Sequence, residues 1–314
     1  MHFGVYTDTA GMFNIEEILA SCEKNGLTGV ELGAANWNET PVVPVKELLA
    51  GTITADEFKK PFEERGIKID ALNCSGNPVH PVEGPAHKEG LINTIKTASL
   101  LGVKTVVTCS GLPAGAPGDQ TPNWVTTHWP PENHRIQEYQ WNEVMIPFWK
   151  EIVPIAREAG VRIAFELHPT MMVYNLYTYK KLVEGVGDCL DVLGINMDPS
   201  HMMWMGGDGR EIVKAVPEQI FHCHLKDVVY HDAQRLVNGN LDNKIGTSEY
   251  RSWNFDTPGR GRDAKWWQSF LDTLHEAGYD GILSCELEVY DGTEQETITR
   301  AVTFMKPLAE KYLN

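Results

Sequence analysis

Residues 157–166 read REAGVRIAFE, and this stretch decides the fold because it joins the end of a helix to the start of a buried strand. Gly160 stands where a helix needs a left-handed residue to end, and the apolar run after it is typical of a strand. The same phrase occurs four more times, as EKNGLTGVEL (23–32), EERGIKIDAL (63–72), SLLGVKTVVT (99–108) and HEAGYDGILS (275–284). Each phrase therefore predicts a junction from helix to strand.

Three more apolar runs complete the set of predicted strands, namely HFGVYT (2–7), VLGINMD (192–198) and QIFHCHL (219–225). Eight units in 314 residues give about 39 residues each, as expected for a (β/α)8 barrel. An open doubly wound sheet is the alternative, but no GxGxxG follows the first strand. We therefore predict an α/β fold, a single (β/α)8 TIM barrel over residues 1–314. The segment at about 226–262 is too long for an ordinary loop, and we interpret it as a lid or an assembly surface.

Composition and charge exclude several classes of protein. Lys and Arg total 27 against 43 Asp and Glu, a net charge of −16 that opposes binding to nucleic acid or to an anionic membrane. The six cysteines include no CxxC pair, so we expect free thiols. The sequence shows neither a secretory signal nor an apolar run long enough to span a membrane. We predict a cytoplasmic protein.

Ionisable side chains stand at the C-terminal ends of the last four strands, which is where barrel enzymes have their active sites. They are Glu166, His168, Asp198, His201, His222, His224, Lys226, Asp227, Glu286 and Glu288. Any one of them alone could be a helix cap or an ion-pair partner. Converging buried carboxylates would repel one another unless a cation neutralised them, so the set together predicts a divalent metal site. The absence of a thiolate cluster argues against structural zinc.

The phrases FELHP, NMDPSH, HCHLKD, WNFDTPGRGRDAKWW and ILSCELE resemble the xylose-isomerase-like barrel superfamily of sugar phosphate isomerases and epimerases, which includes inosose dehydratases and ketose 3-epimerases. The resemblance spans nearly the whole chain. It implies that one divalent ion is held by Glu166, Asp198, His224 and Glu286, with Mn²⁺ preferred over Co²⁺, Mg²⁺ or Zn²⁺. It also implies that His201 contacts the substrate.

The sequence also departs from the ketose 3-epimerases. In those enzymes a Gly-Glu pair follows the ligand on the seventh strand and an Arg comes soon after, whereas here Leu225-Lys226-Asp227 follows and Tyr230 stands at the later position. The HxHLKD phrase is more similar to inosose-dehydratase-like proteins, and the catalytic subunits of bacterial C-deglycosidases share this barrel type. The alternative function is therefore elimination from a 3-keto-glycoside.

All of these reactions on a keto-sugar, keto-glycoside or inosose share an enediolate intermediate. Return of the proton to the other face of the carbon gives epimerisation, its return to the neighbouring carbon gives isomerisation, and loss of a β substituent gives dehydration or glycoside elimination. We expect Glu166 and Glu286 to serve as base and acid, and His201 and Lys226 to bind substrate oxygens.

Further side chains are candidates for the substrate pocket. We assign His168, His222 and Trp124 to substrate binding, with structural roles as the alternative for His222 and Glu288. Trp129, Trp141 and Trp149 of the same region are read as core or dimer residues, with stacking on a sugar face as the alternative for Trp129. Proton shuttles could come from His80, His128 and His134.

Two other function classes remain open. The endonuclease IV type of phosphoesterase shares the barrel but needs a basic surface to face DNA. A sugar-binding protein without catalysis is the second. For an enzyme we expect a small carbohydrate or cyclitol substrate and a homo-oligomer, or a hetero-oligomer with a small second subunit.

Overall fold

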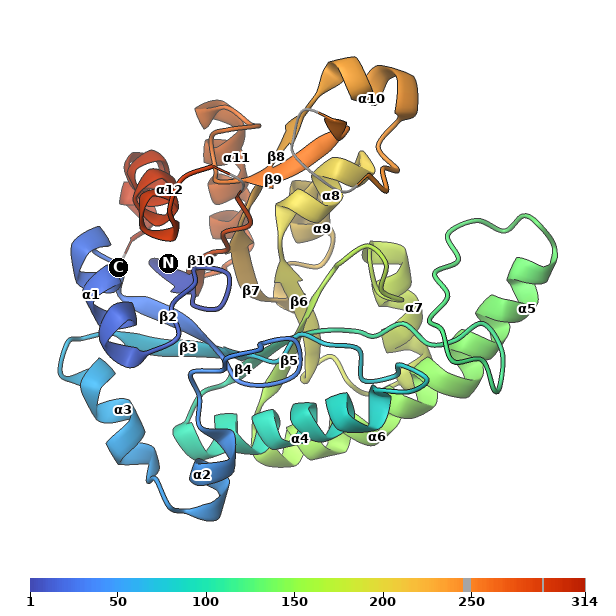
Figure 1. Ribbon diagram of the computed structural model, residues 1–314, viewed down its shortest axis with the longest axis horizontal. Helices are drawn as coiled ribbons and strands as arrows, with labels where there is room; N and C mark the ends of the chain where they lie inside the picture. Colours follow the sequence, from blue (N-terminus) through green and yellow to red (C-terminus); the bar gives the residue numbers. More distant parts are fainter. Residues whose placement is uncertain (245–249, 290, 314) are drawn as a thin grey trace. The chain divides into compact units, whose positions relative to one another are not determined.

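Eight parallel strands close into a barrel in the computed structural model, which describes residues 1–244, 250–289 and 291–313 (Figure 1). Their order around the barrel is β1-β10-β7-β6-β5-β4-β3-β2. They are β1 (His2–Tyr6), β2 (Gly29–Gly33), β3 (Lys68–Asn73), β4 (Thr105–Cys109), β5 (Arg162–Glu166), β6 (Leu193–Met197), β7 (Ile220–Leu225) and β10 (Ile282–Cys285). Every one of them overlaps a stretch in which the sequence predicts a strand, so the TIM barrel is confirmed.

Helices lie between the strands along the chain. They are α1 (Ile15–Asn25), α2 (Val45–Ala50), α3 (Ala55–Glu63), α4 (Gly84–Leu101), α5 (Glu132–Glu138), α6 (Ile146–Ala159), α7 (Leu176–Val186), α8 (Pro199–Met205), α9 (Gly209–Ala215), α10 (Asp232–Asn238), α11 (Ala264–Glu276) and α12 (Glu294–Ala309). A π-helical turn (Tyr139–Met145) joins α5 to α6, and 3-10 turns lie at Pro217–Gln219 and Glu310–Tyr312. Among the described residues, no helix is both long and apolar enough to cross a membrane.

The junction glycines behave as the repeated phrase predicts. Gly26, Gly66, Gly102, Gly160 and Gly278 all have a positive φ, between 66° and 79°. This left-handed conformation strains residues that carry a Cβ, and it lets the backbone N–H turn back to the last carbonyls of the helix. The N–H of Gly160, for example, points at the carbonyl of Ala156 in α6.

The chain divides into two compact units, each built from separate stretches. The first unit is Met1–Leu32, Lys60–Asp70 and Met197–Asn314, and the second is Gly33–Lys59 and Ala71–Asn196. In the first unit α11 packs on α9 and α12; in the second, α4 packs on α6 (Figure 1). The single domain over 1–314 remains a prediction.

The long segment 226–262 carries secondary structure of its own. It contains β8 (Asp227–Tyr230) and β9 (Trp253–Asp256), which pair as an antiparallel ribbon, and α10 between them. The register sets Val228 opposite Phe255. The predicted long loop is therefore an ordered excursion over the residues that the structure describes.

Candidate metal centre

Asp198 lies at the junction between β6 and α8 and caps the helix. Its Oδ1 accepts the N–H of Ser200 at 2.8 Å, and Pro199 takes the first helical position. An Asp at the cap position and a Pro at the first helical position are both typical of a helix start, so the helix begins directly after the strand at this residue. The side chain of Asp198 is nevertheless buried, so its second oxygen faces the protein interior rather than solvent.

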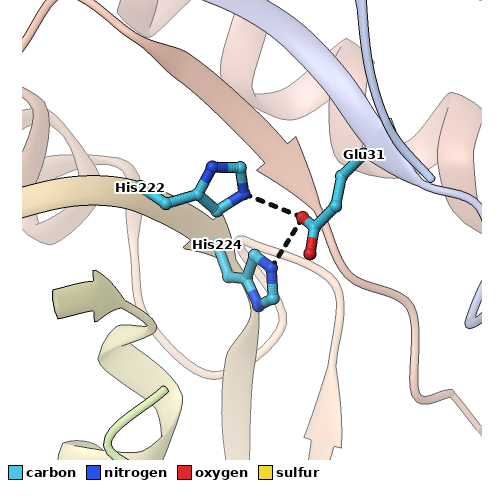
Figure 2. A group of neighbouring side chains, drawn as sticks. All are labelled: Glu31, His222 and His224. Atoms are coloured by element: carbon cyan, nitrogen blue, oxygen red, sulfur yellow. Dashed lines mark hydrogen bonds and ion pairs between the residues drawn. The ribbon is translucent and has the colours of Figure 1, made fainter. Parts of the chain in front are cut away.

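Two histidines and a lysine alternate along β7 and just beyond it. His222 and His224 share one face of the strand because side chains of a strand alternate with a period of two, and both are buried (Figure 2). Lys226 follows on the same face and is 0% exposed. Ser284 of β10 is in register with His224, and Glu286 follows two residues later.

Three of the predicted metal ligands come together in the first unit. Single ligand atoms of Asp198, His224 and Glu286 all lie within 4.8 Å of one another, and all three residues are buried. Nδ1 of His224 is 2.9 Å from Oε2 of Glu286. Two carboxylates and an imidazole are a donor set that suits Mn²⁺, Co²⁺ or Zn²⁺.

The ammonium of Lys226 is bound by the same carboxylates. Its Nζ lies 2.6 Å from Oε2 of Glu286, 3.1 Å from Oδ2 of Asp198 and 3.0 Å from Oε1 of Glu288. The ring of Phe255 in β9 covers the ammonium, with 4.5 Å between Nζ and the ring centroid. Burial alone would raise the pKa of Glu286, but the positive charges of Lys226 and His224 hold that pKa well below its usual range. Glu286 is therefore ionised at neutral pH.

Glu31 of β2 was missed by the sequence reasoning. Its Oε2 lies 2.8 Å from Nε2 of His222, 2.9 Å from Nε2 of His224 and 2.9 Å from Oγ of Ser284 (Figure 2). Burial would raise the pKa of Glu31, but the two histidines lower it below its ordinary value. For His224, burial would lower the pKa, and the charges of Glu31 and Glu286 raise it well above the usual range instead. One signal was visible in the sequence, since Glu31 is the only charged residue in the run 25–38.

His201 stands one helical turn after Asp198, in α8. Its Nε2 is 3.4 Å from Oδ2 of Asp198, and its ring meets the ring of Phe255 edge to face at 5.3 Å. Burial lowers the pKa of His201 to about 4, so its ring is neutral at pH 7. The predicted substrate contact thus lies beside Asp198 of the metal cluster, as an uncharged hydrogen-bonding group.

The remaining predicted site residues belong to the second unit. Glu166 ends β5, is buried, and is in register with Asn196 of β6, two residues before Asp198 in the chain. Nδ1 of the half-buried His168 contacts the carbonyl of Pro169. The half-buried Trp124 packs edge to face on Tyr174, with 5.5 Å between ring centroids.

The other candidates of the second unit differ in exposure. Trp141 and Trp149 are buried, as expected of core residues, whereas Trp129 is 70% exposed. Nδ1 of His80 accepts the N–H of Glu83, and the rings of His128 and His134 lie 6.3 Å apart. Their role as proton shuttles stays a prediction.

The cysteines confirm the expectation of free thiols. All six are free and buried. Burial raises the pKa of Cys285 to about 12 and raises that of Cys223 well above its ordinary value. Cys223 and Cys285, which adjoin His224 and Glu286 in the chain, are therefore packing residues rather than nucleophiles.

Comparison with known proteins agrees with this fold. A family model described as "Xylose isomerase-like TIM barrel" matches residues 19–308. The chain belongs to this family. Among relatives of this xylose isomerase-like barrel, "Uncharacterized protein YfiH" of Bacillus subtilis (strain 168) is 37% identical over 311 residues, 98% of each chain. An inosose isomerase of Halalkalibacterium halodurans is 27% identical over 294 residues, covering 92% of this chain and 89% of the relative.

A solved structure shares the barrel as well. The crystal structure of the IolI protein with a bound zinc atom superposes with a TM-score of 0.65 and 23% identity, covering 100% of both chains. At this level of identity the match shows the fold alone.

Proposed function

We propose that this protein is a divalent-metal-dependent enzyme that moves a proton at the carbon next to the carbonyl of a keto-sugar, keto-glycoside or inosose. The observation that carries the proposal is the buried cluster of Asp198, His224 and Glu286 at the C-terminal ends of β6, β7 and β10. Active sites of barrels lie at this end of the strands. The relative named inosose isomerase and the zinc in the IolI structure support the same class.

We propose Glu166 as the fourth ligand. β5, which Glu166 ends, is the neighbour of β6 in the barrel order, and parallel strands end at the same face. Three carboxylates and one imidazole suit Mn²⁺, our preferred ion, as well as Co²⁺, Mg²⁺ and Zn²⁺. When bound, the ion supplies Lewis acidity toward a substrate carbonyl oxygen and its neighbouring hydroxyl.

The chain's own residues move the proton. Glu166 accepts the proton from the substrate carbon as the base, and Glu286 delivers a proton at the opposite face as the acid. The electron pair of the broken C–H bond moves into an enediolate. Lys226 and the neutral His201 donate hydrogen bonds to substrate oxygens, and we keep His168 and Trp124 as further substrate contacts. Because His222 is bound to Glu31, we favour its structural alternative.

The first test is the metal content of the protein purified without chelator, measured by mass spectrometry. We expect about one equivalent of divalent metal in the wild type and its loss in Asp198→Ala. Asp208→Ala is the matched control, because Asp208 also caps a short helix by accepting the N–H two residues on, at 3.0 Å, and is not part of the cluster. Absence of metal in the wild type after reconstitution would overturn the proposal.

The second test follows proton exchange in D₂O with inososes, ketohexoses and 3-keto-glycosides as substrates. The wild type should incorporate deuterium at the carbon next to the carbonyl, and Glu166→Gln should lose this exchange. Retained exchange in Glu166→Gln contradicts its assigned role. The product separates the three fates of the proton. Elimination releases water or an aglycone, whereas epimerisation and isomerisation keep every atom of the substrate; of these two, only isomerisation moves the carbonyl group. The predicted homo-oligomer, or hetero-oligomer with a small subunit, remains a proposal.

A further inference from the structure

Each ring nitrogen of His224 faces a carboxylate. One carboxylate belongs to the proposed metal ligands and the other does not. Nδ1 is 2.9 Å from Oε2 of Glu286, a proposed metal ligand. Nε2 is 2.9 Å from Oε2 of Glu31, which is absent from the proposed ligand set (Figure 2). The ring therefore lies between the metal cluster on one side and Glu31 on the other.

Glu31 is anchored from more than one strand. Besides His224, its Oε2 accepts hydrogen bonds from Nε2 of His222 on the same strand β7, and from Oγ of Ser284 on β10. Its neighbours Val30 and Leu32 are fully buried, and the Glu31 side chain is itself 0% exposed. Burying a carboxylate is unfavourable unless it is hydrogen-bonded, and here three donors surround one oxygen.

The geometry fixes which nitrogen of His224 is available to a cation. A carboxylate only accepts hydrogen bonds, so in the protein without metal both ring nitrogens carry a hydrogen, Nε2 toward Glu31 and Nδ1 toward Glu286. A cation held by Glu286 and Asp198 would replace the hydrogen on Nδ1, while Glu31 retains the hydrogen on Nε2. Histidines that bind metals usually donate the other N–H to a carboxylate or carbonyl, which sets the tautomer and the direction of the ring.

We propose that Glu31 is a positioning residue that holds the Nε2–H of His224 and so directs its Nδ1 toward the metal cluster. This inference rests on the proposed metal site. His222 and Ser284 keep the Glu31 carboxylate in place rather than contacting the metal themselves. The role differs from that of a ligand, because Glu31 acts only through His224.

The test is the affinity for Co²⁺ alone, titrated into the full-length protein and followed by its visible absorption, which also reports the coordination geometry. In Glu31→Gln we expect the dissociation constant to rise roughly 10- to 100-fold with an altered absorption spectrum. Ser284→Ala is the matched control, because it removes a donor to the same Glu31 oxygen but leaves the bond to His224; its affinity should stay within about threefold of the wild type. If Glu31→Gln does not fold, Glu31→Asp keeps the charge, shortens the reach and should weaken binding in the same direction.

A double-mutant cycle separates positioning from a merely structural role. When His224 is already replaced by Ala, the further change Glu31→Gln should leave Co²⁺ affinity unaltered, because the residue through which it acts is gone. An equal loss in both backgrounds, or wild-type affinity in Glu31→Gln, overturns the inference. So does a second equivalent of Co²⁺ that disappears in Glu31→Gln, since Glu31 would then be a ligand. A wild type that binds no Co²⁺ counts against the proposed function instead.

Discussion

The Lys226 ammonium lies 2.6 Å from Oε2 of Glu286, the same oxygen that faces Nδ1 of His224. The lysine also contacts Asp198, so it neutralises two proposed metal ligands in the protein without metal. A metal ion and Lys226 thus interact with the same carboxylates. This arrangement makes the stability of the protein depend on which cation is present.

Replacing Lys226 with Met should therefore lower the stability of the metal-free protein. Buried carboxylates that lose a partner are costly, and we expect a loss of roughly 3 kcal/mol in the free energy of unfolding. Thermal melts in chelator and in Zn²⁺ check this, and Zn²⁺ should raise the melting temperature of Lys226→Met more than that of the wild type. Lys214→Met is the control, because the Lys214 side chain is 55% exposed and forms a surface salt bridge with Glu211 across one helical turn. Equal melting of wild type and Lys226→Met in chelator would contradict the prediction.

The neutral state of His201 should make stability depend on pH. Its pKa is about 4 in the folded protein, against an ordinary value of 6.5. Between these values the unfolded chain binds a proton that the folded chain does not, so the free energy of unfolding falls as the pH drops from 6.5 toward 4. The full effect is about 3 kcal/mol.

The measurement is urea unfolding in chelator at several pH values, for wild type and His201→Gln. Other acidic groups titrate in the same range, so the quantity of interest is the difference between the two curves. That difference should change by about 3 kcal/mol between pH 7 and pH 4. Parallel curves would show that His201 does not set this dependence.

The barrel could be predicted from the sequence because its signals are local. A glycine that must adopt a positive φ, followed by an apolar run, appears within ten residues, and each such phrase gave one correct junction. A cluster of ionisable groups at the ends of the last four strands was also predictable, because the ends of parallel strands meet. The choice of Asp198, His224 and Glu286 among those groups came from the resemblance to the family, and these three do lie together.

Glu31 could not be assigned in the same way. It lies inside β2 rather than beyond its end, and its partners His222 and His224 are 191 and 193 residues away in the chain. Only the pairing across the barrel interior brings them together. The direct contacts of Lys226 with Asp198 and Glu286 were missed for a related reason, since the sequence shows a lysine at a strand end but not the direction of its long side chain.

Asp227 should be essential for the excursion 226–262. Its Oδ2 accepts the backbone N–H groups of Gly259, Gly261 and Arg262 at 3.0, 3.1 and 2.9 Å, and its Oδ1 accepts that of Val228 at 2.7 Å. In Asp227→Asn, either orientation of the amide sets an NH₂ group against a backbone N–H. We expect a loss of roughly 3 kcal/mol in unfolding free energy and faster proteolysis within 226–262.

The matched control for Asp227 is Asp263→Asn. The Asp263 side chain caps α11 by accepting the N–H of Trp266 at 2.9 Å, and Asn is an equally good cap, so the change should be nearly neutral. Limited proteolysis followed by mass spectrometry locates the cleavage sites. Unchanged cleavage within 226–262 in Asp227→Asn would show that other contacts hold the excursion.

Gly261 should be the least replaceable of the residues whose backbone N–H groups bind the Asp227 carboxylate. A Cβ at this position would overlap the backbone carbonyl of Val228, the residue that begins the ribbon with Asp227. A backbone atom cannot move aside as a side chain can, so Gly261→Ala must displace either the N–H that binds Asp227 or the strand itself. We expect a loss of about 3 kcal/mol in the free energy of unfolding, which is at the upper end of the losses seen for overpacked sites.

Gly51→Ala provides the comparison. Gly51 has a φ of 71° but nothing within 4 Å of its added Cβ, so only the conformational cost of about 1 kcal/mol applies. Equal losses in the two variants, measured by urea unfolding, would contradict the prediction that the contact with Val228 makes Gly261→Ala the more costly change.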